Sequence, residues 1–201
     1  MKGGPIVRSR VPDFGSGPVD GGSELRGGLD SDQAAQQIYR ACGDREIDRT
    51  SIFQRDLAGF RAPIDRYQMQ IRRRMTVKVT EDPPTKTWWE ACTFGGFDRT
   101  RFELIDKTTQ QSLASVIFWR IEPLGTSWGV QAAGLVDLEV HEEHRKQGMA
   151  TFLVSEALKQ LGQSGFHRVE VQTMQANTAA INLYQKLGFR EVEGGAVFRK
   201  D

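Results

Sequence analysis

The stretch Gly134–Leu161, GLVDLEVHEEHRKQGMATFLVSEALKQL, changes its hydrophobic period halfway along and decides the fold. Its first half is an apolar run typical of a strand buried in a sheet: Leu135, Val136, Leu138 and Val140. In the second half the apolar residues recur at intervals of three and four, which predicts a helix with one buried stripe: Met149, Phe152, Leu153, Ala157 and Leu161. The stretch therefore predicts a strand, a turn and a helix in that order.

The turn between these two elements has the properties of an anion site. The first N–H groups of a helix have no internal partner, and the helix dipole adds partial positive charge there. Gly148 allows close backbone approach because it has no Cβ, and Arg145 and Lys146 add cationic side chains at the same end. Cationic side chains at a helix start are repelled by the positive end of the helix dipole, and a bound phosphate would offset this repulsion. A solvated basic turn is the alternative interpretation.

Bulk composition excludes several classes of protein. The 201 residues suit one domain, alone or with an appendage, and 38% hydrophobic with 26% charged residues is ordinary for a globular protein. A net charge of +1 argues against a protein that mainly coats nucleic acid. No apolar run has the length of a membrane span, no signal sequence is evident, and the 2 cysteines form neither a metal motif nor a disulfide framework. We expect a cytoplasmic protein without a metal site or membrane partner.

The amino-terminal part of the chain falls into two regions. Residues 1–30 are rich in Gly and Pro and show no core-forming period, which predicts a flexible arm. Residues 31–74 are expected to be a helical extension or the first part of the main domain, which covers residues 75–201. Helices are predicted over Ser31–Arg40 and Asp48–Ala58.

Residues 67–97 carry an alternating pattern followed by two tryptophans. Between Tyr67 and Thr80 apolar and polar residues alternate, which predicts strands. Arg72–Arg74 lie within this pattern and are interpreted as a solvated run, with a phosphate or RNA contact as the alternative. Trp88 and Trp89 are expected to anchor a core or to line a substrate cleft.

The remaining chain predicts a hairpin followed by alternating strands and helices. The hairpin covers residues 101–121, and the strand 169–173 and the helix 176–187 follow the central stretch, with Gly188 as the helix cap. Two terminal strands are predicted around a turn at Gly194–Gly195. Antiparallel strands that lead into strand–helix–strand units give a mixed α/β sheet with helices on both faces.

Two segments resemble the signatures of the GNAT superfamily of N-acetyltransferases. LEVHEEHRKQGMA, residues 138–150, is similar to the family's acyl-CoA motif, Gln/Arg-x-x-Gly-x-Gly/Ala after a Leu-x-Val strand. VQTMQANTAAINLYQKLGF, residues 171–189, is similar to the second signature, with Asn, Ala, Tyr and Leu-Gly-Phe at these intervals. The resemblance covers residues 102–199 and implies a mostly antiparallel central sheet, with one pair of parallel strands that splay apart.

The resemblance also implies acetyl-CoA as co-substrate and a set of residues that bind it. The turn would hold the pyrophosphate through backbone N–H groups, the preceding strand would pair with the pantetheine arm, and Asn177, also a helix N-cap, would hold the pantetheine amide. The expected cofactor-binding residues are Leu138, Val140, Arg145, Lys146, Gln147, Gly148, Met149, Ala150, Thr151, Asn177, Ala180 and Tyr184.

Two catalytic roles follow from the same resemblance. Tyr184 matches the family's general-acid tyrosine, which protonates the leaving thiolate; a core tyrosine is the alternative. Some family members use a Glu as base on the second splayed strand, but Gln172 stands there and cannot titrate. Glu139 is the candidate base, with Asp137, expected on the same strand face, and Glu103 as alternatives. Asp137 is also a candidate substrate-binding residue, together with Trp88 and Trp89.

These observations predict an N-acetyltransferase that moves the acetyl group of acetyl-CoA to a primary amine by direct attack in a ternary complex. The alternative is a non-catalytic module that binds acyl-CoA. Specificity is expected from Asp65–Phe97 and from a loop at Leu124–Ala133. The acceptor would be a small molecule or a protein terminus, with no nucleic-acid partner, and a homodimer is left open. An RNA-associated protein that uses Arg8, Arg10 and Arg72–Arg74 is a third, less favoured interpretation.

Overall fold

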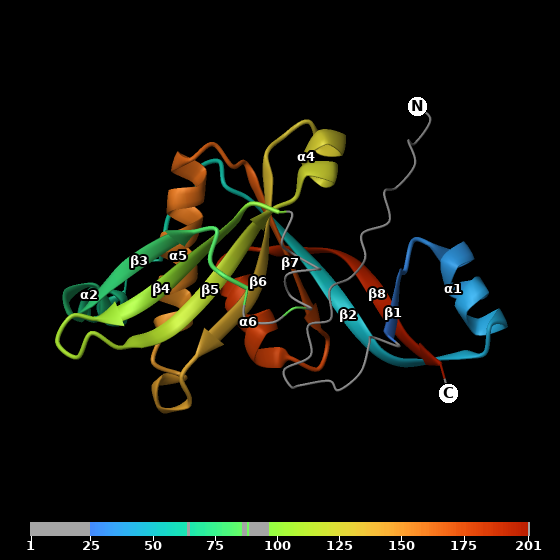
Figure 1. Ribbon diagram of the computed structural model, residues 1–201, viewed down its shortest axis with the longest axis horizontal. Coiled ribbons are helices and arrows are strands. Elements are labelled where there is room, and N and C mark those ends of the chain that lie inside the picture. The colour runs from blue at the N-terminus through green and yellow to red at the C-terminus, as the bar shows by residue number, and fades with distance from the viewer. Residues whose placement is uncertain (1–24, 64, 86–87, 89–96, 201) are drawn as a thin grey trace. The chain divides into compact units, whose positions relative to one another are not determined.

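The computed structural model describes residues 25–63, 65–85, 88 and 97–200 and arranges them as eight strands with helices around them (Figure 1). The strands are β1 (Leu25–Leu29), β2 (Asp44–Asp56), β3 (Met75–Glu81), β4 (Arg99–Asp106), β5 (Ser112–Arg120), β6 (Ala132–Val140), β7 (Arg168–Met174) and β8 (Arg190–Lys200). The helices are α1 (Gln33–Ala41), α2 (Arg66–Arg74), α4 (Glu122–Trp128), α5 (Met149–Gln163) and α6 (Thr178–Lys186), with a 3₁₀ turn η1 (Glu142–His144).

Hydrogen bonds order the strands as β1-β8-β2-β7-β6-β5-β4-β3. The pairs β1/β8, β2/β8, β3/β4, β4/β5 and β5/β6 are antiparallel, whereas β6 and β7 are parallel. The expectation of a mixed, mostly antiparallel sheet with one parallel pair is confirmed. The parallel pair arises because α5 returns the chain from the end of β6 to the start of β7, as a strand–helix–strand unit requires.

The chain divides into two compact units that interleave in sequence. The first unit contains β1, α1, most of β2, the end of β7, α6 and β8; the second contains Arg55–Val171 together with Lys186–Gly188. In the first unit β8 lies between β1 and β2 and pairs with both. In the second unit α5 packs on β4, β5 and β6 and covers one face of these strands.

The core of the second unit follows from the alternation along its central strands. Phe102, Leu104, Val116 and Phe118 are at most 2% exposed, and the Phe102 and Phe118 rings meet edge to face at 5.7 Å. These four side chains share one face because Phe102 pairs with Val116. On α5, Leu153, Val154, Ala157 and Leu158 are fully buried. Burying a large apolar side chain of this kind stabilises the fold by about 1.5–3 kcal/mol relative to leaving it exposed. The packing of this layer therefore holds β6 and α5 in place against each other.

The strand β6 contains a bulge that the sequence did not reveal. Ser115 pairs with Glu139 and Ile117 pairs with Val136, so β6 carries one extra residue between two successive pairs. Asp137 has a positive φ of 52° there, a conformation that Asp tolerates better than most residues. The bulge interrupts the alternation that placed Asp137 and Glu139 on one face. Glu139 instead shares its face with Val136.

The parallel pairing of β6 with β7 covers only the start of β6. It runs from Ala132 opposite Arg168 to Leu135 opposite Val171, whereas β6 pairs with β5 as far as Val140. The edge of β6 after Leu135 therefore has no partner from β7 in this ladder. This short register matches the expected splaying of the parallel pair.

The predicted helix at Asp48–Ala58 is wrong, because these residues lie mainly in β2. Four consecutive residues of β2, Thr50 to Phe53, are buried, and the register against β8 shifts between Ile52 and Phe53. Adjacent inward residues imitate the spacing of a helix stripe. Pairing with β8 then overrides the helical interpretation.

The predicted strand at Tyr67–Ile71 is also wrong, since α2 occupies these residues. Tyr67 and Met69 are 68% and 53% exposed, so the apparent alternation does not describe a buried face. The residues that are buried, Gln68 and Ile71, are three apart, which is the helical spacing. Asp65 begins α2 and accepts a hydrogen bond from the Gln68 N–H at 2.8 Å. The strand prediction holds from Met75 onward as β3.

The predicted turn at Gly194–Gly195 is wrong because β8 runs straight through both residues. A Cβ on Gly194 would meet the Asp30 carboxylate, and one on Gly195 would lie 2.9 Å from Thr50 Oγ1. The glycines thus allow β1 and β2 to approach β8 closely. The arm predicted over residues 1–30 also ends earlier than expected, because Leu25–Leu29 form β1; residues 1–24 lie outside the described part of the chain.

The loop predicted at Leu124–Ala133 is replaced by the helix α4 and the start of β6. Together with Arg120 and His167, this segment lines an open pocket at the amino-terminal end of β6. That pocket lies at the opposite end of β6 from the turn that leads into α5.

Candidate acyl-CoA site

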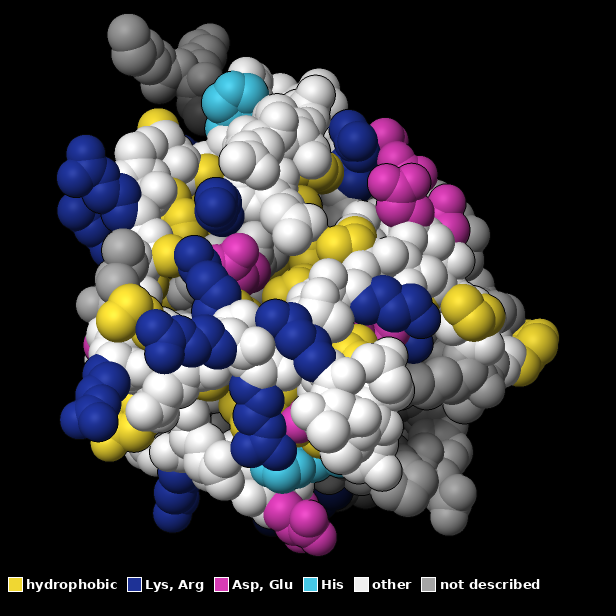
Figure 2. Space-filling model, turned by 90° about the vertical axis from the view of Figure 1, so that its left-hand side faces the viewer, with side chains coloured by type: hydrophobic (Ala, Val, Ile, Leu, Met, Phe, Trp, Pro, Cys, Tyr) yellow, Lys and Arg dark blue, Asp and Glu magenta, His cyan; other side chains and the backbone are white. Residues whose placement is uncertain are grey.

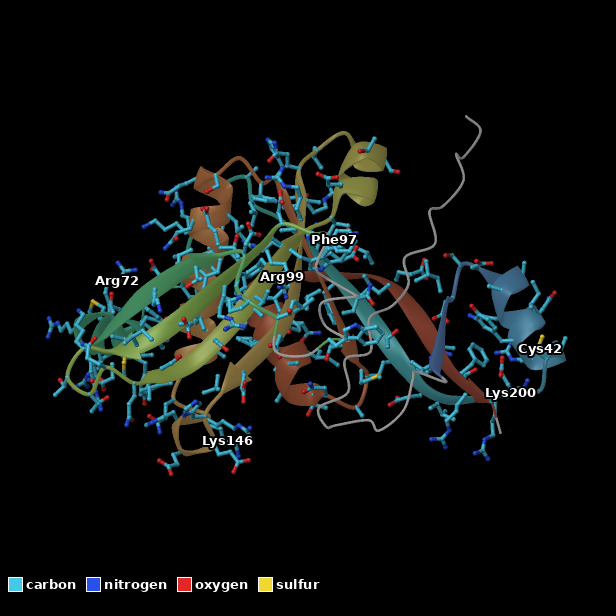
Figure 3. All side chains as sticks on the ribbon, in the orientation of Figure 1. Cys42, Arg72, Phe97, Arg99, Lys146 and Lys200 are labelled. Atoms are coloured by element: carbon cyan, nitrogen blue, oxygen red, sulfur yellow. The ribbon has the colours of Figure 1, made fainter. Side chains whose placement is uncertain are left out.

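The second unit holds most of the expected cofactor-binding residues in one strand–turn–helix segment. β6 ends at Val140, η1 follows, and α5 begins at Met149. Lys146, labelled in Figure 3, lies on this turn below the end of β6. The predicted strand, turn and helix of the central stretch are therefore confirmed.

Backbone conformation makes this turn concave. Lys146 and Gly148 have φ values of 60° and 80°, two left-handed residues on either side of Gln147. Such alternation points successive N–H groups toward one side and forms an anion-binding nest. Among the described residues, no backbone acceptor is found for the N–H groups of residues 146–151, and the first bond of α5 runs from Phe152 N–H to the Gly148 carbonyl at 3.0 Å. These N–H groups are available to a bound anion.

The side chains around the turn stabilise its shape. Arg145 Nε donates to the Val140 carbonyl at 3.1 Å, and its Nη1 approaches Glu142 at 3.2 Å. The Gln147 side-chain amide donates to the Glu143 carbonyl at 2.9 Å. Arg145 and Gln147 thus close the turn on itself, whereas Lys146 is exposed. The positive charge at this turn therefore comes mainly from the backbone N–H groups and from Lys146, and less from Arg145.

Gly148 is favoured by its backbone conformation. Its φ of 80° strains any residue with a Cβ, although a Cβ there would make only ordinary van der Waals contacts, at 3.4 Å from Gln68 Nε2 and 3.7 Å from Ile71 Cδ1 of α2. Gln68 donates a long hydrogen bond of 3.4 Å to the Gly148 carbonyl. The helix start has no side-chain cap. A pyrophosphate fits this arrangement, because it would supply acceptors to N–H groups that the protein leaves without them.

The other expected residues of this segment differ in exposure. Leu138 and Val140 are half-buried at the end of β6, and Met149 and Thr151 are buried in the first turn of α5. Thr151 accepts a hydrogen bond from Ser155 Oγ through its carbonyl at 2.6 Å. Ala150 is half-buried beside them. Asp137 and Glu139 are exposed, so both are accessible to an acceptor molecule.

The remaining expected residues lie on α6, in the first unit. Asn177 precedes this helix, and its Oδ1 accepts a hydrogen bond from the Ala180 N–H at 3.1 Å. This contact confirms the predicted N-cap. Gly188 follows the helix with a positive φ of 76°, which confirms the predicted end.

Tyr184 is the one buried side chain of α6 and is 4% exposed. Its ring packs against Phe53 and Phe189, with centroids 6.2 and 5.6 Å away. Among the described residues, no hydrogen-bond partner is found for its hydroxyl. Burial raises the pKa of Tyr184 to about 12, because removal from water disfavours the phenolate. The hydroxyl therefore stays protonated at neutral pH and can donate a hydrogen bond.

Two expected substrate residues stand apart from these segments. Trp88 is 76% exposed, which does not fit a core anchor. Trp89 lies outside the described residues. Gln172 lies in β7, within the first unit.

The arginine run at the end of α2 has structural partners. Arg72 pairs with Glu156 and lies 5.9 Å above the Phe152 ring, and Arg74 pairs with Asp106 at 2.9 Å. Cations at a helix carboxyl end also interact favourably with the helix dipole. Figure 2 shows many Lys and Arg side chains on the face where α2 and β3 lie in Figure 1. Arg72 and Arg74 are thus held by ion pairs, at the helix end where the dipole favours cations.

Two negative findings apply to the described part of the chain. None of its helices combines the length and apolar character that crossing a bilayer requires. Nor do three or more His, Cys, Asp or Glu side chains gather there in a way that would hold a metal ion.

Comparison with known proteins identifies the family of the chain. The model of the "Acetyltransferase (GNAT) family" matches residues 69–189, more than half of the chain. A curated relative, "Uncharacterized N-acetyltransferase YobR" of Bacillus subtilis (strain 168), is 31% identical over 94 residues, which cover 47% of this chain and 34% of that protein. The chain thus spans about a third of the length of this relative.

Solved structures share the fold at low sequence identity. A "Tandem GNAT protein from the clavulanic acid biosynthesis pathway" superposes with a TM-score of 0.65 at 14% identity, over 87% of this chain and 62% of that chain. A GCN5-related N-acetyltransferase from Sphaerobacter thermophilus gives a TM-score of 0.61 at 14% identity, over 88% and 58%. With the family match over residues 69–189, these findings show that the chain belongs to the GNAT family of acetyltransferases.

Proposed function

We propose that this protein transfers the acetyl group of acetyl-CoA to a primary amine by direct attack, without a covalent enzyme intermediate. The observation that carries the proposal is the turn before α5, whose N–H groups at residues 146–151 lack backbone acceptors while Lys146 and Gly148 hold them in a nest. Such a turn suits a diphosphate. Acetyl-CoA supplies an activated acyl group as a thioester; the steps below concern the residues of this chain.

The edge of β6 orients the acyl donor in this proposal. Its pairing with β7 ends at Leu135, so backbone groups of residues 136–140 can pair with the amides of the pantetheine arm. A backbone N–H of this edge would also stabilise the negative charge that develops on the thioester oxygen. The bulge at Asp137 shifts the register of β6 at this edge. The shift interrupts the regular ladder, so backbone N–H and C=O groups of β6 are available to the donor.

Tyr184 assists departure of the sulfur by donating a hydrogen bond to it, rather than by transferring its proton as a general acid. Its pKa of about 12 lies some three to four units above the roughly 8.5 of an ordinary thiol, so complete transfer of its proton is uphill by about 4–5 kcal/mol. A hydrogen bond that strengthens as charge develops on sulfur does not incur this cost. The proton that ends on the thiol then comes from the nitrogen of the attacking amine.

Glu139 accepts the first proton, directly or through water, when the substrate arrives as an ammonium ion. It is exposed and follows the bulge of β6. The amine must be neutral to attack, so a carboxylate that binds the ammonium and takes its proton serves both requirements. No cysteine is needed as a nucleophile in this scheme.

Release of free coenzyme A from acetyl-CoA, measured with a thiol reagent over a panel of primary amines, tests the proposal. We expect turnover with at least one amine and saturable binding of acetyl-CoA in calorimetry. A non-catalytic acyl-CoA module is the second candidate, since Gln172 stands where some family members carry a Glu base. Tight binding of coenzyme A without turnover of any amine would support the module.

A further inference from the structure

Gln68 is a buried polar residue that the reaction described above does not use. It lies in the first turn of α2 and is 6% exposed, although glutamine is mostly a surface residue. Its Nε2 donates to the Gly148 carbonyl at 3.4 Å, across 80 positions of sequence. Gln68 also precedes residues 69–189, which match the family, so that match does not include this contact.

The helix α2 is held at both ends and packs directly against the turn before α5. Asp65 accepts a hydrogen bond from the Gln68 N–H at 2.8 Å and fixes the start of the helix. At the other end, Lys107 Nζ donates to two carbonyls of the last turn, at 3.2 and 3.0 Å. Ile71, which is 8% exposed, would lie 3.7 Å from a Cβ on Gly148. The Gln68 side chain therefore approaches the turn from a fixed support.

The carbonyl that Gln68 contacts belongs to the same peptide unit as the Met149 N–H, one of the donors of the turn. The Phe152 N–H also donates to this Gly148 carbonyl, at 3.0 Å, so the oxygen accepts two hydrogen bonds. A trans peptide unit is planar, and its C=O and N–H point in opposite directions. Two donors on the oxygen therefore fix the direction of the Met149 N–H, and they also polarise it.

We propose that Gln68 is a positioning residue for the diphosphate of acetyl-CoA. Its amide holds the Gly148–Met149 peptide from the side opposite the ligand, so that the N–H is aimed at the phosphate oxygens before the ligand arrives. Donors that are already oriented bind an anion more tightly, because less ordering is needed on binding. Gln68 acts through the main chain and touches no ligand atom. The inference rests on the proposed use of acetyl-CoA and adds α2 to the elements that form its site.

Calorimetry of the full chain with coenzyme A tests this role. Gln68→Met keeps the length of the side chain but removes the donor, and it should weaken coenzyme A binding about three- to tenfold, the factor that one hydrogen bond is worth. Gln68→Glu places a carboxylate against the Gly148 carbonyl oxygen and should weaken binding at least about tenfold. Thermal melts check that both variants fold. Unchanged affinity in both variants overturns the inference.

Gln36→Met is the matched control, because it removes an equally buried amide from another helix. Gln36 of α1 is 8% exposed, and its Nε2 donates to the Leu29 carbonyl at 2.9 Å within the first unit. We expect this variant to lose thermal stability, as Gln68→Met does, and to bind coenzyme A within about twofold of wild type. If Gln36→Met weakens binding as much as Gln68→Met, the loss follows from stability alone and the inference is wrong.

A ligand without the diphosphate separates positioning from a general structural role. Pantetheine, followed by ligand-observed NMR because its binding is weaker, should bind wild type and Gln68→Met equally within about twofold. An equal loss for pantetheine and coenzyme A would mean that Gln68 supports the whole site, which overturns the inference. If coenzyme A binding follows these expectations and no amine is acetylated, the proposed transfer reaction fails and the inference stands.

Discussion

The turn before α5 and the helix α6 contribute to the proposed reaction in opposite ways. The turn offers backbone N–H groups at residues 146–151, and its two anchoring side chains, Arg145 and Gln147, mainly hold its shape. α6 offers one buried side chain, Tyr184, whose surroundings raise its pKa to about 12. Binding is distributed over many main-chain groups in the turn, whereas chemistry on α6 depends on one oxygen atom.

This difference predicts which substitutions matter. A site made of backbone groups tolerates changes of side chain, except where a residue such as Gly148 permits the backbone conformation. A site that depends on one side chain loses its function when that side chain is replaced, although the surrounding structure is kept. The predictions below separate the two cases and run from the largest expected effect to the smallest.

Tyr184→Phe should reduce kcat about 100- to 1000-fold and leave the Kd of acetyl-CoA within about threefold, because the hydroxyl acts on charge that develops during reaction. Steady-state kinetics and calorimetry measure the two quantities. Tyr67→Phe, at a residue that is 68% exposed, is the matched control and should behave as wild type. A Tyr184→Phe enzyme with unchanged kcat would remove Tyr184 from the mechanism.

Gly148→Glu should weaken acetyl-CoA binding at least about 100-fold, because it strains a left-handed residue and places a negative charge in the nest. Lys146→Ala, two residues earlier, should weaken binding only about two- to threefold, since it removes an exposed charge and keeps the backbone. Calorimetry gives both values. If Lys146→Ala costs as much as Gly148→Glu, side chains rather than the main chain hold the diphosphate.

The raised pKa of Tyr184 predicts a dependence of stability on pH. The folded protein holds this proton more tightly than the unfolded chain, whose tyrosine pKa is about 10, so the stabilisation is complete below pH 10 and is lost as pH rises toward 12. The loss approaches about 3 kcal/mol. Absorbance of tyrosinate should show a late phase near pH 12, and Tyr184→Phe should abolish it. A tyrosinate titration that Tyr184→Phe leaves unchanged would contradict the burial of Tyr184.

Asn177→Ala should lower the free energy of unfolding by about 1 kcal/mol, because it removes the cap that accepts the Ala180 N–H. Asn177→Asp keeps the cap and changes the amide, so it isolates the expected contact with pantetheine. Chemical denaturation and calorimetry of both variants separate stability from affinity. Normal acetyl-CoA affinity in Asn177→Asp would assign Asn177 to the helix alone.

The sequence was informative where local signals agreed with one another. From Leu135 to Leu161 the period changes from strand to helix, and the structure follows it as β6 and α5. On α6 the cap Asn177 and the stop Gly188 mark both ends. In both places a few neighbouring residues determine the element, so a single sequence suffices.

Several of the missed features depend on contacts that are distant in sequence. Thr50 Oγ1 meets Gly195 across 145 residues, and that approach, rather than a turn, explains the glycine. The bulge between Ile52 and Phe53 exists only against β8, and the one at Asp137 only against β5.

The position of β8 between β1 and β2 has a consequence for how the protein is made. Neither β1 nor β2 pairs with the other: β1 pairs with β8, and β2 lies between β8 and β7, so β1 needs residues 190–200 and β2 needs residues 168–200 before their ladders are complete. During translation these early strands must wait, unpaired, while more than a hundred residues emerge from the ribosome. The segment Arg55–Val171 has no such dependence on β8 for its own ladders, so it can fold on the ribosome first.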